Sequence, residues 1–225
     1  MGHALGVWLR TFHSWVSEPA QIDMQKTIGK NKSMRQLKYK ISYGAFLGVI
    51  QKFPEIWERY SKVLEEVRDM AAAEYTESVQ DNAENNWQII HEGPQPAGIN
   101  IFIIDWELAQ IGRIEYDLGQ MIGDLYERKH FMNAHTALWM IQGFVFGYGV
   151  LSDDMAFRIA IHAGVHLICW YIRGNPAAPF TKPPEQIQDA MRIGTEFIVR
   201  GWTRDRAWFE SSELACLFQE RSKQA

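Results

Sequence analysis

The sequence predicts a mainly α-helical protein with one small β-hairpin. Apolar residues recur every three or four positions through most of the chain, as they do on the buried face of a helix. Only two short runs, 87–91 and 101–105, have the composition typical of strands. With 225 residues, 47% of them hydrophobic and 22% charged, the chain can bury a substantial core, and we expect residues 1–225 to form a single helical domain.

Three amphipathic helices are expected in the first third of the chain, with apolar faces over residues 5–15, 37–50 and 54–73. Pro54 is acceptable at the start of the third helix because the first turn has no hydrogen bond for a proline to remove. Residues 74–84 lose the helical spacing and carry several charges. This segment is predicted to be a surface loop.

The two strand-like runs are expected to pair as a hairpin across a connection rich in Gly and Pro. Helices are predicted again after the hairpin, at 117–131, 134–149, 154–173, 184–200 and 202–221. Within the second of these, Gly143, Gly147 and Gly149 are small residues that would allow another helix to pack closely.

The candidate chemistry begins where the run Ile101-Phe102-Ile103-Ile104 ends at Asp105. Ligand sites tend to form at the carboxyl ends of buried strands, so this carboxylate is placed to hold a metal. The alternative is that Asp105 only caps the turn that follows. Trp106-Glu107, Gly112 and Asp117-Leu118-Gly119 come next in the sequence.

This arrangement resembles the aminoglycoside phosphotransferase and choline kinase-like family, which has a protein-kinase-like fold. Residues 5–13 also look like the helix that begins the family's carboxy-terminal lobe. The resemblance implies transfer of a phosphoryl group from ATP to a hydroxyl of a small-molecule substrate, with Mg²⁺ held by Asp105. It further implies that Asp117 is a structural residue that braces the catalytic loop, although capping the helix before Leu118 would explain Asp117 equally well.

The catalytic loop of that family is disrupted in this sequence. The family carries His-Gly-Asp and, five residues later, an Asn; here His91 remains, but Gly93 and Gly98 occupy the positions of the base and the metal-binding amide. Glycine has no side chain, so we assign no catalytic residue and regard His91 as a remnant of the loop. Glu92 and Asn100 are one and two residues out of register, whereas a base must come within hydrogen-bonding reach of its proton.

The family's amino-terminal lobe, which covers the ATP phosphates, has no counterpart before Leu5. We therefore expect a carboxy-terminal lobe without its partner lobe, with weak or absent binding of ATP and Mg²⁺ and little activity on its own. Apolar surface that faces the other lobe in the family is expected to cause self-association. Three interpretations remain open: a truncated or mis-spliced phosphotransferase, a pseudokinase-type binding module without catalysis, and an unrelated helical interaction protein.

Composition argues against several other classes of protein. The formal charge of −4 and the pI near 6.0 disfavour nucleic-acid binding, which depends on clustered Lys and Arg. Cys169 and Cys216 lie far apart in sequence and suggest neither a disulfide nor a zinc site. The longest apolar run, 137–151, is shorter than the roughly 18 residues that a membrane span needs. A soluble cytoplasmic protein is expected.

Two further groups of residues have competing interpretations. His162 and His166 share a helix face, and we interpret them as buried histidines rather than as a pair of metal ligands. Aromatic residues are frequent in the second half of the chain, and core packing explains most of them. The alternative is a pocket for a cationic acceptor, formed by Trp139, Trp170, Tyr171, Trp202 and Trp208 with nearby acidic residues.

Overall fold

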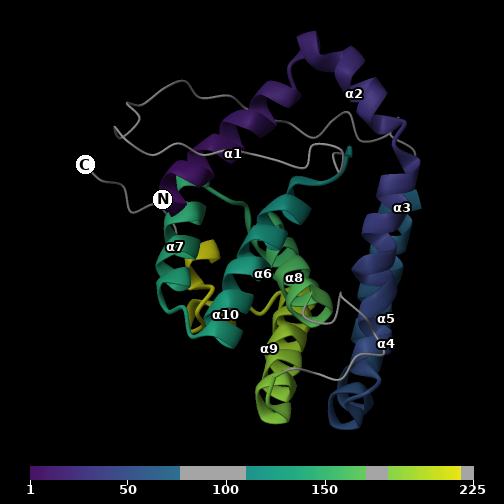
Figure 1. The fold of residues 1–225 in the computed structure, drawn as a ribbon, viewed down its shortest axis with the longest axis vertical. Helices are drawn as coiled ribbons and strands as arrows, with labels where there is room; N and C mark the ends of the chain where they lie inside the picture. Colours follow the sequence, from purple (N-terminus) through teal and green to yellow (C-terminus); the bar gives the residue numbers. More distant parts are fainter. Residues whose placement is uncertain (77–109, 171–181, 219–225) are drawn as a thin grey trace.

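The computed structural model describes residues 1–76, 110–170 and 182–218, and within these ranges the chain is helical and contains no strand (Figure 1). The first range holds α1 (Gly2–Val16), η1 (Pro19–Gln21), α2 (Ile22–Gly29), α3 (Lys32–Ile41), α4 (Tyr43–Ile50) and α5 (Pro54–Thr76). The other two hold α6 (Ile114–Met132), α7 (Thr136–Tyr148), α8 (Asp153–Trp170), α9 (Pro184–Trp202), α10 (Arg206–Glu210) and η3 (Ala215–Phe218). The mainly α prediction is confirmed, and the predicted hairpin lies outside the described residues.

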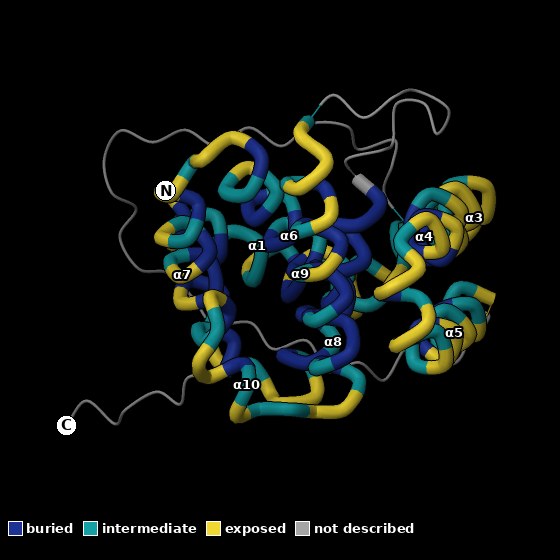
Figure 2. The backbone as a smooth tube through the Cα atoms, turned by 90° about the horizontal axis from the view of Figure 1, so that it is seen from below, coloured by how far each residue is buried: buried dark blue, intermediate teal, exposed yellow. Residues whose placement is uncertain are grey.

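Helix α8 forms the centre of the core. It packs against α6, α9 and α4, and Figure 2 shows it as one of the most buried elements. Its side chains Ile159, Leu167 and Ile168 are all 0% exposed. Helices α3, α4 and α5 lie together on one side of the molecule (Figure 1). Polar residues of α8 therefore lie within reach of residues from α4, α5 and α6.

Helices α1 and α7 approach each other closely because glycines face each other across their contact. A Cβ on Gly6 would lie 2.1 Å from the carbonyl oxygen of Phe144, and one on Gly147 would lie 2.1 Å from that of His3. No larger residue fits at either position without moving a backbone. The predicted close packing at Gly147 is confirmed, and its partner is α1.

Two of the predicted helices are wrong in extent. The helix expected over 37–50 is divided into α3 and α4 at Ser42, whose φ of −118° and ψ of −97° are not helical. The Ser42 hydroxyl donates to the carbonyl of Lys38 at 2.6 Å, and the Ser42 carbonyl accepts from the Cys169 thiol at 3.3 Å. The hydroxyl contact satisfies the Lys38 carbonyl, which a continuous helix would pair with the Ser42 N–H, and that N–H instead donates to the carbonyl of Tyr39 at 3.2 Å.

The helix expected over 202–221 is broken in its described part into α10 and η3. Arg204 has a left-handed backbone with φ of 58°, which ends the helical path after α9. The Asp205 side chain then accepts from the backbone N–H of Trp208 at 3.1 Å and begins α10. Helix α2 was not predicted, and Glu74–Thr76 extend α5 into the predicted loop 74–84, whose remainder lies outside the described residues. No helix of the described ranges is long and apolar enough to cross a membrane.

Candidate functional site

Asp117 is the one predicted site residue that falls within the described part of the chain. His91 and Asp105 both lie in 77–109, outside the described residues. Helix α6 begins at Ile114, so Asp117 lies in its first turn, and the interpretation of Asp117 as the cap of this helix is wrong. An acidic residue in the first turn is stabilised by the partial positive charge of the helix N-terminus.

Asp117 joins three helices through His13. The Nε2 of His13, on α1, lies 3.1 Å from Oδ2 of Asp117, and its Nδ1 lies 3.0 Å from the hydroxyl of Tyr148 on α7. Burial, and then the charges of Asp117 and Glu115, raise the pKa of Tyr148, so its hydroxyl stays protonated. The Tyr148 hydroxyl and the Asp117 carboxylate thus contact the two ring nitrogens of His13. This chain of contacts fixes the start of α6 against α1 and α7.

A cluster of four charged residues lies where segment 77–109 leaves and re-enters the helical body. We call Glu74, Arg113, Glu115 and Arg158 the ion cluster. Arg113 donates to Glu115 at 2.9 Å and has a nitrogen 3.8 Å from Glu74, while Arg158 pairs with Glu74 and lies 3.7 Å from Glu115. Glu74 is near the end of α5 and Arg113 directly precedes α6, so the cluster holds together the two points between which His91 and Asp105 lie in the sequence.

The ion cluster is largely removed from water. The side chains of Glu74 and Glu115 are 15% and 9% exposed, and burial lowers the pKa of Arg158 from its usual value. The two carboxylates and the two guanidinium groups of the ion cluster together carry no net charge. Because removing one member of such a group leaves an uncompensated buried charge, the cluster is expected to form as a unit.

Aromatic rings extend the ion cluster into the core. Tyr116 donates its hydroxyl to Glu74, and its ring lies 5.3 Å from that of Tyr75 and 4.8 Å from that of His162. His162 Nδ1 also lies 3.1 Å from the Tyr43 hydroxyl. Burial first, and then interaction with neighbouring tyrosine hydroxyls, raises the pKa of Tyr43 and Tyr116, so both hydroxyls stay neutral. Local sequence gives no signal for this packing, because its members come from four helices.

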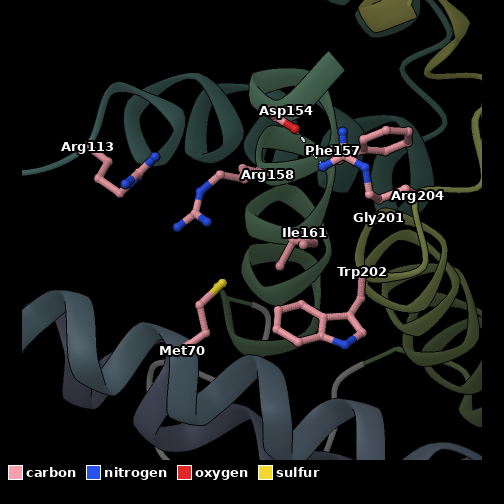
Figure 3. Close-up of a pocket in the computed structure, with 9 residues that line it drawn as sticks. All are labelled: Met70, Arg113, Asp154, Phe157, Arg158, Ile161, Gly201, Trp202 and Arg204. Atoms are coloured by element: carbon pink, nitrogen blue, oxygen red, sulfur yellow. Dashed lines mark ion pairs between the residues drawn. The ribbon is translucent and has the colours of Figure 1, made fainter. Parts of the chain in front are cut away.

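A cavity of about 310 Å³ adjoins the ion cluster (Figure 3). One part of its lining is apolar, formed by Met70, Phe157, Ile161 and Trp202. The rest of the lining consists of three arginines together with Asp154 and Gly201.

Each of the three lining arginines has an acidic partner. Arg113 and Arg158 belong to the ion cluster, and Arg204 pairs with Asp154, as the dashed line in Figure 3 shows. The guanidinium of Arg204 also lies 5.1 Å above the ring of Phe157. Lining by arginines disfavours an organic cation, so this cavity does not match the cationic acceptor pocket considered from the sequence.

Of the aromatic residues considered for that pocket, Tyr171 and the side chain of Trp170 lie outside the described residues, and the other three are dispersed. Trp202 lines the cavity, Trp208 packs edge-on against Phe197 and Phe209, and Trp139 is 73% exposed. Core packing therefore explains Trp208, as we expected from the sequence for most of the aromatic residues.

Comparison with known proteins points to phosphotransferases. The chain is 28% identical over 217 residues to phosphotransferase FrzJ of Cladobotryum sp, an alignment that covers 92% of this chain and 55% of that protein. It is 29% identical over 83 residues to 4-hydroxytryptamine kinase of Psilocybe cubensis, covering 36% of this chain and 23% of the kinase. These similarities indicate a phosphotransferase- or kinase-like family, and the chain spans about half the length of FrzJ. No family model matches the sequence, and no solved structure matches it.

Proposed function

We propose that the chain is the carboxy-terminal lobe of a small-molecule kinase that transfers the γ-phosphoryl group of ATP to a hydroxyl. The observation that carries this proposal is the alignment to a phosphotransferase over 92% of the chain, which extends well beyond the motif around Asp105. The kinase named for 4-hydroxytryptamine supports a small-molecule acceptor. Residues 1–225 would then act as one domain.

Asp105 is the proposed Mg²⁺ ligand. Mg²⁺ prefers carboxylate oxygens and commonly relies on one or two of them together with substrate phosphates. At the described start of α6, Asp117 is 60% exposed, but its Oδ2 already accepts from His13, which suits a bracing residue better than a ligand. The bound ion would neutralise charge on the ATP phosphates.

The ion cluster and the His13–Asp117 contact would position the catalytic segment. The ion cluster includes residues from both sides of segment 77–109, and the His13–Asp117 contact holds the first turn of the helix that follows it. Phosphoryl transfer depends mainly on correct placement of phosphates and hydroxyl. Neither group needs to touch the substrate for this role. Because the ion cluster has no net charge, it would contribute little to the electrostatic field at the site. The charge there would come from the metal and the nucleotide.

The isolated chain is expected to be a poor catalyst. Gly93 stands where the resemblance places the general base, and Gly98 stands where it places the second metal ligand. Loss of a general base alone costs roughly 10²- to 10⁴-fold in rate. These two glycines also favour the second candidate function, a pseudokinase-type module that binds a ligand or partner without chemistry.

The test is nucleotide binding and turnover by the purified 225-residue chain with Mg²⁺ and ATP. We expect weak binding that requires Mg²⁺, with phosphate release no faster than background. Asp105→Ala should abolish the binding, whereas Asp23→Ala, which removes a carboxylate 95% exposed on α2, should not change it. Turnover that depends on Asp105 would overturn the proposed inactivity. Binding that is equal in wild type and Asp105→Ala would overturn the assignment of Asp105 as metal ligand.

A further inference from the structure

A second group of potential metal ligands lies farther along α6. Asp124 and Glu127 of α6 and His166 of α8 each offer one ligand atom, and these three atoms lie within 4.8 Å of one another. Asp124 is nine residues beyond Glu115, about 13 Å along the helix axis. The group is therefore separate from the ion cluster.

Gly123 explains why these three side chains meet. A Cβ at this position would lie 2.7 to 2.9 Å from the Cβ, Cδ2 and Cγ atoms of His166, so only glycine lets the imidazole lie against the backbone of α6. Asp124 is the next residue, and Glu127 lies one helical turn after Gly123 on the same stripe. The close approach of the two helices thus brings a histidine between two carboxylates.

Two carboxylates beside a buried histidine form a group that attracts a cation. His166 is 4% exposed, and Asp124 and Glu127 are partly buried. A carboxylate loses hydration on burial, and a second carboxylate nearby increases its cost. Arg128 pairs with Asp124 at 3.0 Å, but that arginine is 55% exposed and such surface pairs contribute little. A cation between the three side chains would offset both the desolvation and the repulsion.

We propose that Asp124, Glu127 and His166 bind a divalent transition-metal ion of the zinc type. A neutral imidazole with two carboxylates suits Zn²⁺, Co²⁺ or Mn²⁺, whereas Mg²⁺ prefers an all-oxygen shell. Ligand atoms that each lie about 2.1 Å from one ion are roughly 3.0 to 3.5 Å from one another. The three ligand atoms would therefore need to move by about 1 Å to bind the same ion. Three protein ligands leave a coordination position for water. The ion would join α6 to α8.

The first test is equilibrium dialysis of the full chain against ZnCl₂ in the presence of about 1 mM Mg²⁺. The second is the visible absorption spectrum of the chain with Co²⁺ bound. We expect about one ion per chain, and an affinity at least about tenfold weaker in Asp124→Asn and in Glu127→Gln. Both acids are partly exposed, so these variants keep the fold even if His166→Gln does not.

The matched controls are His135→Gln and Asp69→Asn, which alter an exposed histidine and an exposed carboxylate elsewhere. Their affinity should equal that of wild type. Absence of saturable binding would overturn the site, and so would binding that stays unchanged in both Asp124→Asn and Glu127→Gln.

Discussion

Gly147→Ala tests whether the contact between α1 and α7 holds the His13 network in place. The new Cβ would lie 2.1 Å from the carbonyl oxygen of His3, against about 3.4 Å for an ordinary contact, so the helices must separate by about 1.3 Å. Overpacking of this kind lowers the free energy of unfolding by about 3 kcal/mol. The same movement would carry the Tyr148 hydroxyl, now 3.0 Å from His13 Nδ1, out of hydrogen-bonding range.

The assay is urea unfolding followed by tryptophan fluorescence, with Gly48→Ala as the matched control. A Cβ on Gly48 meets nothing within 4 Å, and the position is an exposed one inside α4. The free energy of unfolding of Gly48→Ala should be about 0.5 to 1 kcal/mol higher than that of wild type, because alanine favours the helix and restricts the unfolded chain. Gly147→Ala should lower the midpoint without changing the slope. A midpoint equal to wild type for Gly147→Ala, or an equal loss in Gly48→Ala, would refute the reasoning.

Two other predictions concern a carboxylate and an apolar surface. Partial burial raises the pKa of Glu213, but hydrogen bonds from Lys129 and Tyr126 outweigh it, so the folded pKa lies below the usual value. This carboxylate stabilises the fold above its unfolded pKa and loses that contribution as pH falls through the folded pKa. Urea titrations of Glu213→Gln should therefore show a deficit at pH 7 that shrinks in acid, and a deficit that grows in acid would contradict this. Trp139 and Phe146 of α7 are 73% and 67% exposed, and light scattering should show less self-association after Trp139→Ser and Phe146→Ser than in wild type. A wild-type chain that stays monomeric at high concentration would disprove that prediction.

Apolar spacing was sufficient to predict most of the helices. It predicted α1, α5 and the helices from α6 to α9 because each presents one continuous apolar face to the core. It missed the break at Ser42, since the spacing continues through a residue whose backbone leaves the helix. That break is stabilised by a contact from Cys169, 127 residues away, which no local pattern reveals.

The sequence predicted residues of the candidate site only where they belong to a recognisable motif. Asp117 was found through its place in Asp-Leu-Gly, whereas Tyr148 and Arg158 have no local signal. Tyr148 pairs with a histidine 135 residues away, and Arg158 with a glutamate 84 residues away. His13 belonged to the segment that matched the family, but its contact with Asp117 follows from the packing of α1 on α7.

The pairing of Glu74 with Arg113 has a consequence for how this protein can change through evolution. Two points of the chain that are 39 residues apart in sequence are held together by the helical body itself. Inserting or deleting residues between such fixed points changes the closure entropy only slowly, by about 0.6 kcal/mol for each doubling in length. Segment 77–109 can therefore gain or lose residues while the α-helices of the described residues keep their arrangement.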